Sequence, residues 1–512
     1  MSSMHQPLLG GALLTLAIAT ISSAFVVVDT SQETCFDTSL VITCPAEGSD
    51  YYGQDAQYSG PMPGYTDHGD GTVTDHQTGL MWQQDPGEKM TYDEAKAGAP
   101  TFDLAGYTDW RLPTIKELYS LIRFDGTDPS GYGGSDTSFL VPFIDADYFV
   151  FEYGDPDQGE RIIDSQYASS TESIGYVGDY EQLFGVNFAD GRIKGYWTAP
   201  NPESPDGKEF FVQYVRGDTG YGENEFIDNG DFTVTDNASG LMWLQVDSGE
   251  FGVGEAGDGA LKWAEALQWA ETLEFAGHGD WRLPNIKELQ SIVDYTRAPS
   301  ITESAAIDSI FVSTAIIDEL GATNYPYYWS NTTHFNWLDT GPNASYVAFG
   351  EALGYLDDEW QDVHGTGAQR SDPKTGDPDD YPQGHGPQGD AIRIYNFVRP
   401  VRGGLVGVSY GPDGAPPAPA LRARLSQNHP NPFNPHTQIR FELESRGGAT
   451  LRIFDARGAL VTTLVEAQLE AGPHVLGWDG RNSAGIGVPS GLYFYALEVG
   501  GHIQSRKMIL LK

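Results

Sequence analysis

Apolar residues recur at helical spacing in three segments of the chain. Residues 261–273 place Trp263, Leu267 and Ala270 on one face, and Gly277 follows where such a helix would end. Two further segments begin with a proline in the first turn and continue with apolar residues three or four positions apart. These positions are Ile115, Leu118, Leu121 and Ile122 after Pro113, and Ile286, Leu289, Ile292 and Val293 after Pro284. The pattern predicts short helices that each pack one face on a core.

Strand patterns occupy other parts of the chain. Thr72, Val73 and Thr74 stand between Asp and Gly turn residues and lead through Gly79 into an apolar run, which is typical of a β-hairpin. Beyond residue 423 the apolar and polar positions alternate in runs at 438–443, 450–454, 474–478, 492–497 and 506–511. About seven short strands would make a small sandwich there. We therefore predict an α+β fold class for the middle of the chain and an all-β module at its end.

An internal repeat divides the middle of the chain. Residues 67–82 return with few changes as residues 228–243. Each copy is followed by Gly-x-x-Asp-Trp-Arg-Leu-Pro-x-Ile-Lys-Glu-Leu and ends with a similar strand, and self-similarity of this length indicates duplicated domains. The predicted division is a leader at 1–24, a lead-in at 25–59, a first repeat at 60–217, a second repeat at 223–403, a linker at 404–422 and a third module at 423–512.

The first residues have the pattern of a secretory signal peptide. An apolar run from Leu8 to Phe25 is closed by the small residues Ser22, Ser23 and Ala24, and it is shorter than a membrane-spanning helix. Cleavage after Ala24 is the preferred interpretation. An uncleaved anchor stays open, because this leader lacks the usual Lys or Arg before its apolar run.

Cysteine usage fits an exported protein. Cys35 and Cys44 are the two cysteines of the chain, and both follow the predicted cleavage site closely. Export makes a disulfide between them the expected state. The competing interpretation, a catalytic or metal-binding thiol pair, lacks nearby histidines.

Charge is distributed unevenly. Residues 421–512 carry ten Lys and Arg against seven Asp and Glu, whereas residues 1–420 carry 19 against 65. So acidic a body repels phosphate backbones, which argues against nucleic acid as a partner, and it repels anionic lipid and sulfated polysaccharide unless a cation bridges them. Two explanations stay open: solubility, and acidic loops that recruit divalent cations. Contact with membranes is expected only through export or surface attachment.

An extra acidic segment lies in the second repeat, between Leu356 and Asp390. A long polar loop is the default interpretation, and calcium binding is the alternative. No cofactor is predicted, although calcium is the one that the sequence allows. The weak metal-ligand candidates are Asp357, Asp358, Asp379 and Asp380. The candidate ligand-binding residues are Trp360 and Tyr381 in this segment, and Asn331, Trp337 and Asp339 in the aromatic stretch before it.

The repeated Trp-Arg-Leu-Pro motif could be mistaken for an active site. Arginine cannot act as a general base near neutral pH, whereas tryptophan beside a guanidinium suits a core next to a buried carboxylate or backbone carbonyls. We therefore assign the motif residues a structural role, with ligand binding as the alternative. They are Trp110 and Arg111 in the first repeat, and Trp281 and Arg282 in the second. Lys116-Glu117 and Lys287-Glu288 are predicted to be solvated pairs on the exposed helix faces.

Catalytic motifs give no support for an enzyme. Gly407-Val-Ser-Tyr-Gly411 fits the nucleophile-elbow pattern, but it lies in the predicted linker and Pro412 follows it. The sequence contains neither His-Glu-x-x-His nor a phosphate-binding Gly-x-x-x-x-Gly-Lys-Ser/Thr. We predict a non-enzymatic protein, and an unrecognised hydrolase remains an alternative.

The repeated blocks resemble the Lcl C-terminal domain family, named for a collagen-like bacterial adhesin. They are Asp-x-Gly-Asp-x-Thr-Val-Thr-Asp, Gly-Leu-Met-Trp and Asp-Trp-Arg-Leu-Pro-x-Ile-Lys-Glu-Leu, and both repeats carry them. The resemblance implies two tandem α+β domains with a C-type-lectin-like fold, and glycosaminoglycan recognition as in the naming adhesin. This chain departs from that picture, because it lacks a collagen-like stalk and its body is strongly acidic.

The last module resembles the C-terminal sorting domain of type IX secretion, which is similar to the immunoglobulin-like domain of the flagellar hook-capping protein. Residues 427–435, 453–458, 478–480, 491–495 and 506–512 carry the resemblance. It implies delivery by the type IX secretion machinery to the outer surface of a bacterium or beyond. We predict a secreted or surface-held binding protein, an adhesin for extracellular glycan or another polymer. A structural cell-envelope protein that contacts other surface proteins is the alternative.

Overall fold

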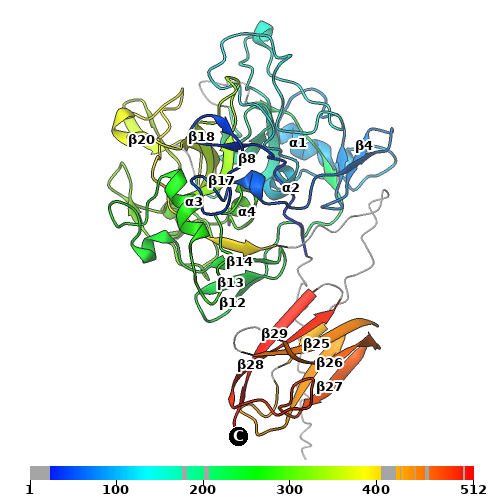
Figure 1. Ribbon diagram of the computed structural model, residues 1–512. Coiled ribbons are helices and arrows are strands. Elements are labelled where there is room, and N and C mark those ends of the chain that lie inside the picture. The colour runs from blue at the N-terminus through cyan, green and yellow to red at the C-terminus, as the bar shows by residue number, and fades with distance from the viewer. Residues whose placement is uncertain are drawn as a thin grey trace, which may run out of the picture. The chain divides into compact units, whose positions relative to one another are not determined.

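The computed structural model describes residues 24–175, 181–200, 207–404, 423–426, 428–443, 446–455, 460–499 and 502–512. The chain forms two compact units that divide between Ala415 and Pro416 (Figure 1). Of the predicted leader only residue 24, and of the predicted linker only residue 404, lies among the described residues. No helix found among these residues has the length and hydrophobicity needed to cross a bilayer.

A six-stranded antiparallel sheet forms the centre of the first unit, with the strand order β17-β18-β21-β9-β8-β7. The two predicted tandem domains share this sheet, because β9 and β21 pair where Ile193 meets Gln369. The two repeats therefore lie in one compact unit. The first repeat supplies β7 (Gln166–Glu172), β8 (Gln182–Asn187) and β9 (Arg192–Trp197), and the second supplies β17 (Tyr327–His334), β18 (Asn343–Ala348) and β21 (Gln369–Pro373).

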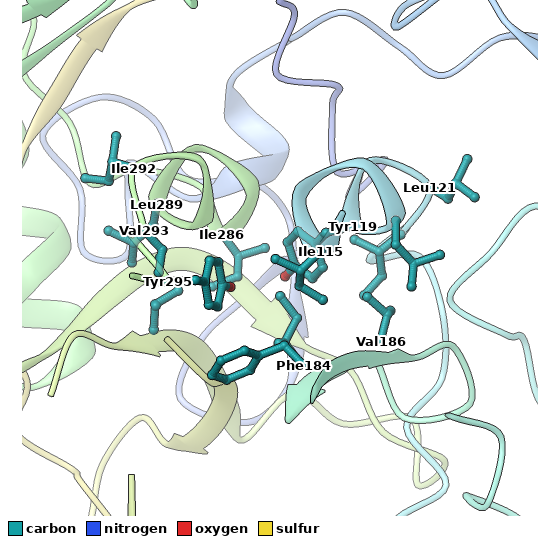
Figure 2. Close-up of a cluster of buried hydrophobic side chains, with 14 of the residues drawn as sticks. Ile115, Tyr119, Leu121, Phe184, Val186, Ile286, Leu289, Ile292, Val293 and Tyr295 are labelled. Atoms are coloured by element: carbon teal, nitrogen blue, oxygen red, sulfur yellow. The ribbon is translucent and has the colours of Figure 1, made fainter. Parts of the chain in front are cut away.

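Two short helices, α2 (Ile115–Ser120) and α4 (Ile286–Ser291), lie side by side on one face of this sheet. Figure 2 shows Ile115 and Ile286 beside Phe184 and Val186 of β8, within one buried apolar cluster. Both helices begin with a capping box, from Thr114 and Asn285. Each ends earlier than the apolar spacing predicts, although the apolar residues beyond it are buried in the same cluster.

Helices α1 (Tyr92–Gly98) and α3 (Trp263–Glu271) pack on the opposite face. Leu183 packs in the cluster of α1 while its neighbour Phe184 packs in that of α2, because successive side chains of a strand point to opposite faces. Each repeat thus places one helix on either side of the shared sheet.

Smaller strands and helices complete the first unit. The predicted hairpin at residues 72–82 is present as β4 and β5 of a four-stranded sheet. The second repeat forms an equivalent four-stranded sheet of its own. The first of these sheets contains β3 (Tyr65–Asp67), β4 (Thr72–Asp75), β5 (Met81–Gln83) and β11 (Val215–Arg216), and the second contains β12 (Phe226–Asp228), β13 (Thr233–Asp236), β14 (Leu241–Leu244) and β22 (Val401–Gly403). The remaining pairs are β1 (Cys35–Phe36) with β2 (Val41–Ile42), β6 (Met90–Thr91) with β10 (Glu209–Phe210), β15 (Ile316–Ile317) with β16 (Thr323–Asn324), and β19 (Leu353–Leu356) with β20 (Glu359–Asp362). The further helices are η1 (Asp55–Gln57), η2 (Ala99–Thr101), η3 (Pro156–Gln158), η4 (Ser248–Phe251), α5 (Pro299–Thr302) and η5 (Pro378–Asp380).

The predicted lead-in joins the two repeats. Phe25, Val26 and Val28 are buried. The side-chain amide of Gln32 donates to the carbonyl oxygens of Phe124 at 3.2 Å and Thr333 at 2.7 Å, one in each repeat. Residues 25–32 therefore contribute to the core.

The structure contains a disulfide between Cys35 and Cys44. Because the two cysteines are only nine positions apart, replacing both by serine is expected to lower the free energy of unfolding by about 2 to 3 kcal/mol. Urea unfolding of the oxidised chain and the double variant measures this difference. A loss twice as large would show that the bond stabilises more than the local hairpin of β1 and β2.

The second unit is a sandwich of two antiparallel sheets, as the sequence predicts. One sheet contains β23 (Ala423–Leu425), β24 (Thr437–Leu443) and β27 (Gly472–Trp478), and the other contains β25 (Gly447–Asp455), β26 (Leu460–Leu469), β28 (Gly491–Val499) and β29 (His502–Leu510). Ile439 and Phe441 of one sheet and Leu451, Ile453 and Tyr495 of the other share one buried core. Strands outnumber helices in both units, so the chain is mostly β.

Candidate functional site

The Trp-Arg-Leu-Pro motif builds the turn before each of the two central helices. Arg111 donates two hydrogen bonds to Glu117 at 2.7 and 2.6 Å, and Arg282 donates two to Glu288 at 2.6 Å. Each carboxylate also accepts the backbone amide of the residue that caps its helix. The tryptophans beside these arginines are buried in the core. Such bidentate pairs fix the geometry of the turn.

The prediction of solvated lysines on the two helices is wrong. Lys116 Nζ of α2 donates to the carbonyl oxygen of Ser291, the last residue of α4, at 2.7 Å. Lys287 Nζ of α4 donates to the carbonyl oxygen of Ser120, the last residue of α2, at 3.0 Å, so each helix binds the C-terminus of the other. Burial lowers the pKa of Lys116 to about 8 and that of Lys287 to about 7. The spacing on one helix could not reveal this, because the second buried face arises from contact between the repeats.

The structure disperses the five candidate ligand-binding residues. Asn331 is fully buried, and its side-chain amide donates to the carbonyl oxygen of Gly53 at 3.1 Å, so it belongs to the interior. Trp360 packs on Tyr355 of the β19–β20 hairpin, with ring centroids 5.4 Å apart, and Tyr381 follows η5. Trp337 and Asp339 lie together in the loop after β17, where Trp337 is half-buried and Asp339 is exposed.

The acidic segment is more ordered than the predicted long loop. Asp357 and Asp358 form the turn between β19 and β20, with φ angles of 52° and 66°, and both are exposed. Two residues with positive φ are typical of a tight hairpin turn. Asp379 and Asp380 both lie in η5 and are exposed. Among the described residues, no three His, Cys, Asp or Glu side chains gather as a metal site.

Other charged residues of the same segment form a buried network. Asp390 forms an ion pair with Arg370. It also accepts a hydrogen bond from His364 Nε2 at 2.6 Å. Burial alone would raise the pKa of Asp390, but Arg370 and His364 hold it below its usual range. Burial and the neighbouring Arg370 lower the pKa of His364 to about 4. The network connects Asp390 to Arg370 of β21, and its charged groups pair with one another.

A partly exposed group of three aromatic rings lies where loops of the two repeats meet. The ring centroid of Tyr132 is 5.1 Å from that of Trp337 and 5.3 Å from that of Phe139. Phe139 is 48% exposed, and the neighbouring Leu338 is 58% exposed. We call Tyr132, Phe139 and Trp337 the aromatic platform.

Backbone hydrogen bonds between the repeats hold the aromatic platform in place. The amide of Asp128 donates to the carbonyl oxygen of Phe335 at 2.9 Å, and the amide of Trp337 donates to that of Asp128 at 3.0 Å. The indole N–H of Trp337 donates to the carbonyl oxygen of Ser130 at 3.2 Å. A fixed cluster of aromatic rings that is partly open to solvent is typical of an interaction site.

Sequence reasoning found one residue of the aromatic platform and missed two. Trp337 was a candidate because it stands in an aromatic and polar stretch of the second repeat. Tyr132 and Phe139 belong to a Gly- and Ser-rich loop of the first repeat. Aromatic residues inside so polar a loop were the available signal, since such loops rarely bury large side chains.

Asp55 of the lead-in is a buried carboxylate in contact with the second repeat. It accepts hydroxyl hydrogen bonds from Thr30 at 2.8 Å and Thr332 at 2.5 Å. Burial raises the pKa of Asp55 from its ordinary value of 3.8 to about 7, against the opposing effect of these hydroxyls. The folded chain therefore binds this proton more tightly than the unfolded chain does.

This shift predicts a pH dependence of stability. The contribution of Asp55 is fully present below about pH 4 and is lost as the pH rises through 7. Between pH 5 and pH 8 the wild-type chain is expected to lose about 2 to 3 kcal/mol more of unfolding free energy than Asp55→Asn. Urea unfolding of both chains at the two pH values measures the difference. Equal losses would show that Asp55 is ionised throughout.

Comparison with known protein families finds one matching family in each unit. The Lcl C-terminal domain family matches residues 71–216 and 232–364, together more than half of the chain. The FlgD Ig-like domain matches residues 431–501, within the second unit. The predicted Lcl C-terminal domain assignment and the predicted similarity of the last module to the hook-capping Ig-like domain are thereby confirmed. No curated protein matches the chain.

Solved structures give distant similarities. FLGD from P. aeruginosa is 18% identical over 18% of this chain and 75% of its own, with a TM-score of 0.14. Dimeric latent PorU from Porphyromonas gingivalis is 14% identical over 66% of this chain and 25% of its own, with a TM-score of 0.17. PorZ, a surface component of the type-IX secretion system of the same organism, is 10% identical over 67% of this chain and 46% of its own, with a TM-score of 0.13. The chain thus spans a quarter of PorU and less than half of PorZ.

Proposed function

The chain belongs to the Lcl C-terminal domain family, and on that premise we propose that it is an exported, surface-held protein whose aromatic platform binds extracellular glycan. The observation that carries the proposal is the partly exposed ring of Tyr132, which packs on both Phe139 and Trp337. Flat aromatic faces pack against the C–H faces of sugar rings, and Tyr and Trp add a polar edge for hydroxyl groups.

The proposed glycan is uncharged. Residues 1–420 carry 65 acidic against 19 basic residues, so a sulfated polymer would be repelled as it approached. Asp136 and Asp339, exposed in the two loops of the aromatic platform, add negative charge near the rings. The glycosaminoglycan recognition implied by the family resemblance is therefore replaced here by binding of a neutral polysaccharide.

Binding without turnover is part of the same proposal, as is a C-type-lectin-like fold for each repeat. The first part is supported by the mutual pairing of the buried charged groups around Asp390, which leaves them committed to one another. The second is supported by the shared plan of each repeat, in which helices cover both faces of three antiparallel strands.

A glycan array read with the full chain tests this function. We expect binding to neutral polysaccharides, little binding to their sulfated counterparts, and no change on adding a calcium chelator. Exclusive binding to sulfated polymers would contradict the proposal, and so would hydrolysis of any arrayed polymer. Silence on the array together with reproducible protein capture would favour the structural envelope alternative.

Delivery to the surface is proposed to use the leader and the second unit as a type IX sorting domain. The Cys35–Cys44 disulfide supports an oxidising compartment, where such bonds persist. Amino-terminal sequencing of the exported protein is expected to begin at Phe25. A chain that lacks residues 423–512 is expected to stay inside the outer membrane, and its normal appearance at the surface would contradict the proposed route.

A further inference from the structure

The two repeats build the same local structure around β7 and β17. In each, the first backbone amide of the helix donates to a threonine hydroxyl of the strand at 3.0 Å. The residue before that threonine donates its amide to the carbonyl oxygen of the proline in the Trp-Arg-Leu-Pro motif, at 2.7 Å in the first repeat and 2.9 Å in the second. The corresponding residues are Thr171 and Thr332, Ser170 and Asn331, and Arg111 and Arg282.

In the second repeat the lead-in covers this structure. Thr332 donates its hydroxyl hydrogen to Asp55 at 2.5 Å, and the side-chain amide of Asn331 donates to the carbonyl oxygen of Gly53 at 3.1 Å. Both partners belong to one short turn that enters η1. The turn therefore recognises the end of β17 with one carboxylate and one carbonyl group.

The same turn also covers the motif arginine. The ring of Tyr58 lies over the guanidinium of Arg282 at 5.1 Å, a cation–π contact. Only 13% of the Arg282 side chain is exposed, and its charge is paired with Glu288. Residues 53–58 thus present a carboxylate and, three positions later, an aromatic ring.

The corresponding surface of the first repeat is open. Ser170 is exposed where Asn331 is fully buried, and 26% of the Arg111 side chain is exposed. No described residue accepts the hydroxyl hydrogen of Thr171, and none of the described aromatic rings lies over Arg111. Thr171 and Arg111 correspond to the two groups that Asp55 and Tyr58 contact in the second repeat. Ser170 has no counterpart of the Asn331 amide, because its hydroxyl donates to the carbonyl oxygen of Pro113 at 3.1 Å.

We propose that Arg111, Ser170 and Thr171 form a docking site for a partner polypeptide that presents an acidic turn followed by an aromatic residue. Its carboxylate would accept from Thr171, and its ring would cover Arg111, as Asp55 and Tyr58 do in the second repeat. The chain's own lead-in is the argument for this chemistry. The site uses none of the residues of the aromatic platform. The chain would therefore bind a protein partner at a second site, separate from the one proposed for glycan.

A labelled synthetic peptide of residues 49–60 is the probe, titrated against the full chain by fluorescence anisotropy. We expect saturable binding of one peptide per chain. A peptide with Asp55→Asn, and another with Tyr58→Ala, are each expected to bind about tenfold more weakly, because each lacks one of the two anchoring contacts. These peptide changes leave the folding of the chain untouched.

A chain variant locates the site. Ser170→Trp places a bulky side chain on the exposed surface and is expected to abolish peptide binding, whereas Ser483→Trp, at an exposed serine of the second unit, should leave it unchanged. Absence of saturable binding to the wild-type chain would overturn the proposal. Binding that survives Ser170→Trp would also overturn it, since the peptide would then be displacing the lead-in from the second repeat. If Ser170→Trp does not fold, equal affinities of the three peptides would be the contradicting result.

Discussion

Replacing Trp337 by alanine is expected to weaken binding of a neutral polysaccharide by about 30-fold, which corresponds to about 2 kcal/mol of binding free energy. Trp337 supplies the largest ring of the aromatic platform, and its indole N–H is already bonded to Ser130, so the ring is held in one orientation. A preorganised aromatic ring loses little entropy on binding. Its removal therefore subtracts contact area that a flexible side chain could not replace.

The matched control is Trp360→Ala. Trp360 is also half-buried and also packs on a tyrosine, but it lies on the β19–β20 hairpin and belongs to no three-ring group among the described residues. Titration calorimetry with the best neutral ligand from the array measures both variants. Trp337→Phe should recover most of the affinity. Equal losses for Trp337→Ala and Trp360→Ala would contradict the assignment of the aromatic platform.

Replacing Asp390 by alanine is expected to lower the free energy of unfolding of the first unit by about 3 to 5 kcal/mol. The change leaves the buried Arg370 guanidinium without its carboxylate and removes the partner of His364. An uncompensated buried charge is far more costly than an exposed one, because water cannot reach it. The loop that precedes Asp390 would also lose its attachment to β21.

Asp379→Ala is the matched control, from the same acidic segment. Asp379 is exposed, so its loss should change stability by no more than about 0.5 kcal/mol. Urea unfolding followed by tryptophan fluorescence compares the two variants. A change below about 1 kcal/mol for Asp390→Ala would show that water solvates the network in the folded chain.

The local structure of the repeats was accessible from the sequence because it depends on short-range pattern. The helices after Pro113 and Pro284 follow from apolar spacing, and the hairpin of β4 and β5 follows from turn residues between strand formers. The second unit was accessible for the same reason, since strands such as β24 alternate buried and exposed residues. In each case neighbouring residues determine the structure.

Contacts between distant segments could not be predicted in this way. The pairing of β9 with β21 joins residues of different repeats. Contact between α2 and α4 buries Lys116 and Lys287, whose helical positions by themselves predict exposure. Asp358 and Asp390 stand in one acidic segment, yet one forms an exposed turn and the other a buried ion pair. Composition does not distinguish them; their positions relative to β20 and β21 do.

The candidate site shows the same division. Trp337 could be selected from its aromatic surroundings, but Tyr132 and Phe139 lie about two hundred positions earlier and meet it through contacts between the two loops at Asp128 and Ser130. Asn331 stands in the same aromatic and polar stretch as Trp337, but its side-chain amide donates to the carbonyl oxygen of Gly53 in the lead-in. A site assembled from two loops of different repeats leaves no single motif in the sequence.

Oxidative footprinting of the full chain, with and without a saturating neutral polysaccharide, tests the central claim most directly. Hydroxyl radicals modify exposed aromatic rings, and mass spectrometry reports each position. We expect protection of Tyr132, Phe139 and Trp337 together, with Trp360 and Tyr381 unchanged. Protection of Trp360 and Tyr381 without the aromatic platform, or equal labelling of all five rings in the bound state, would contradict it.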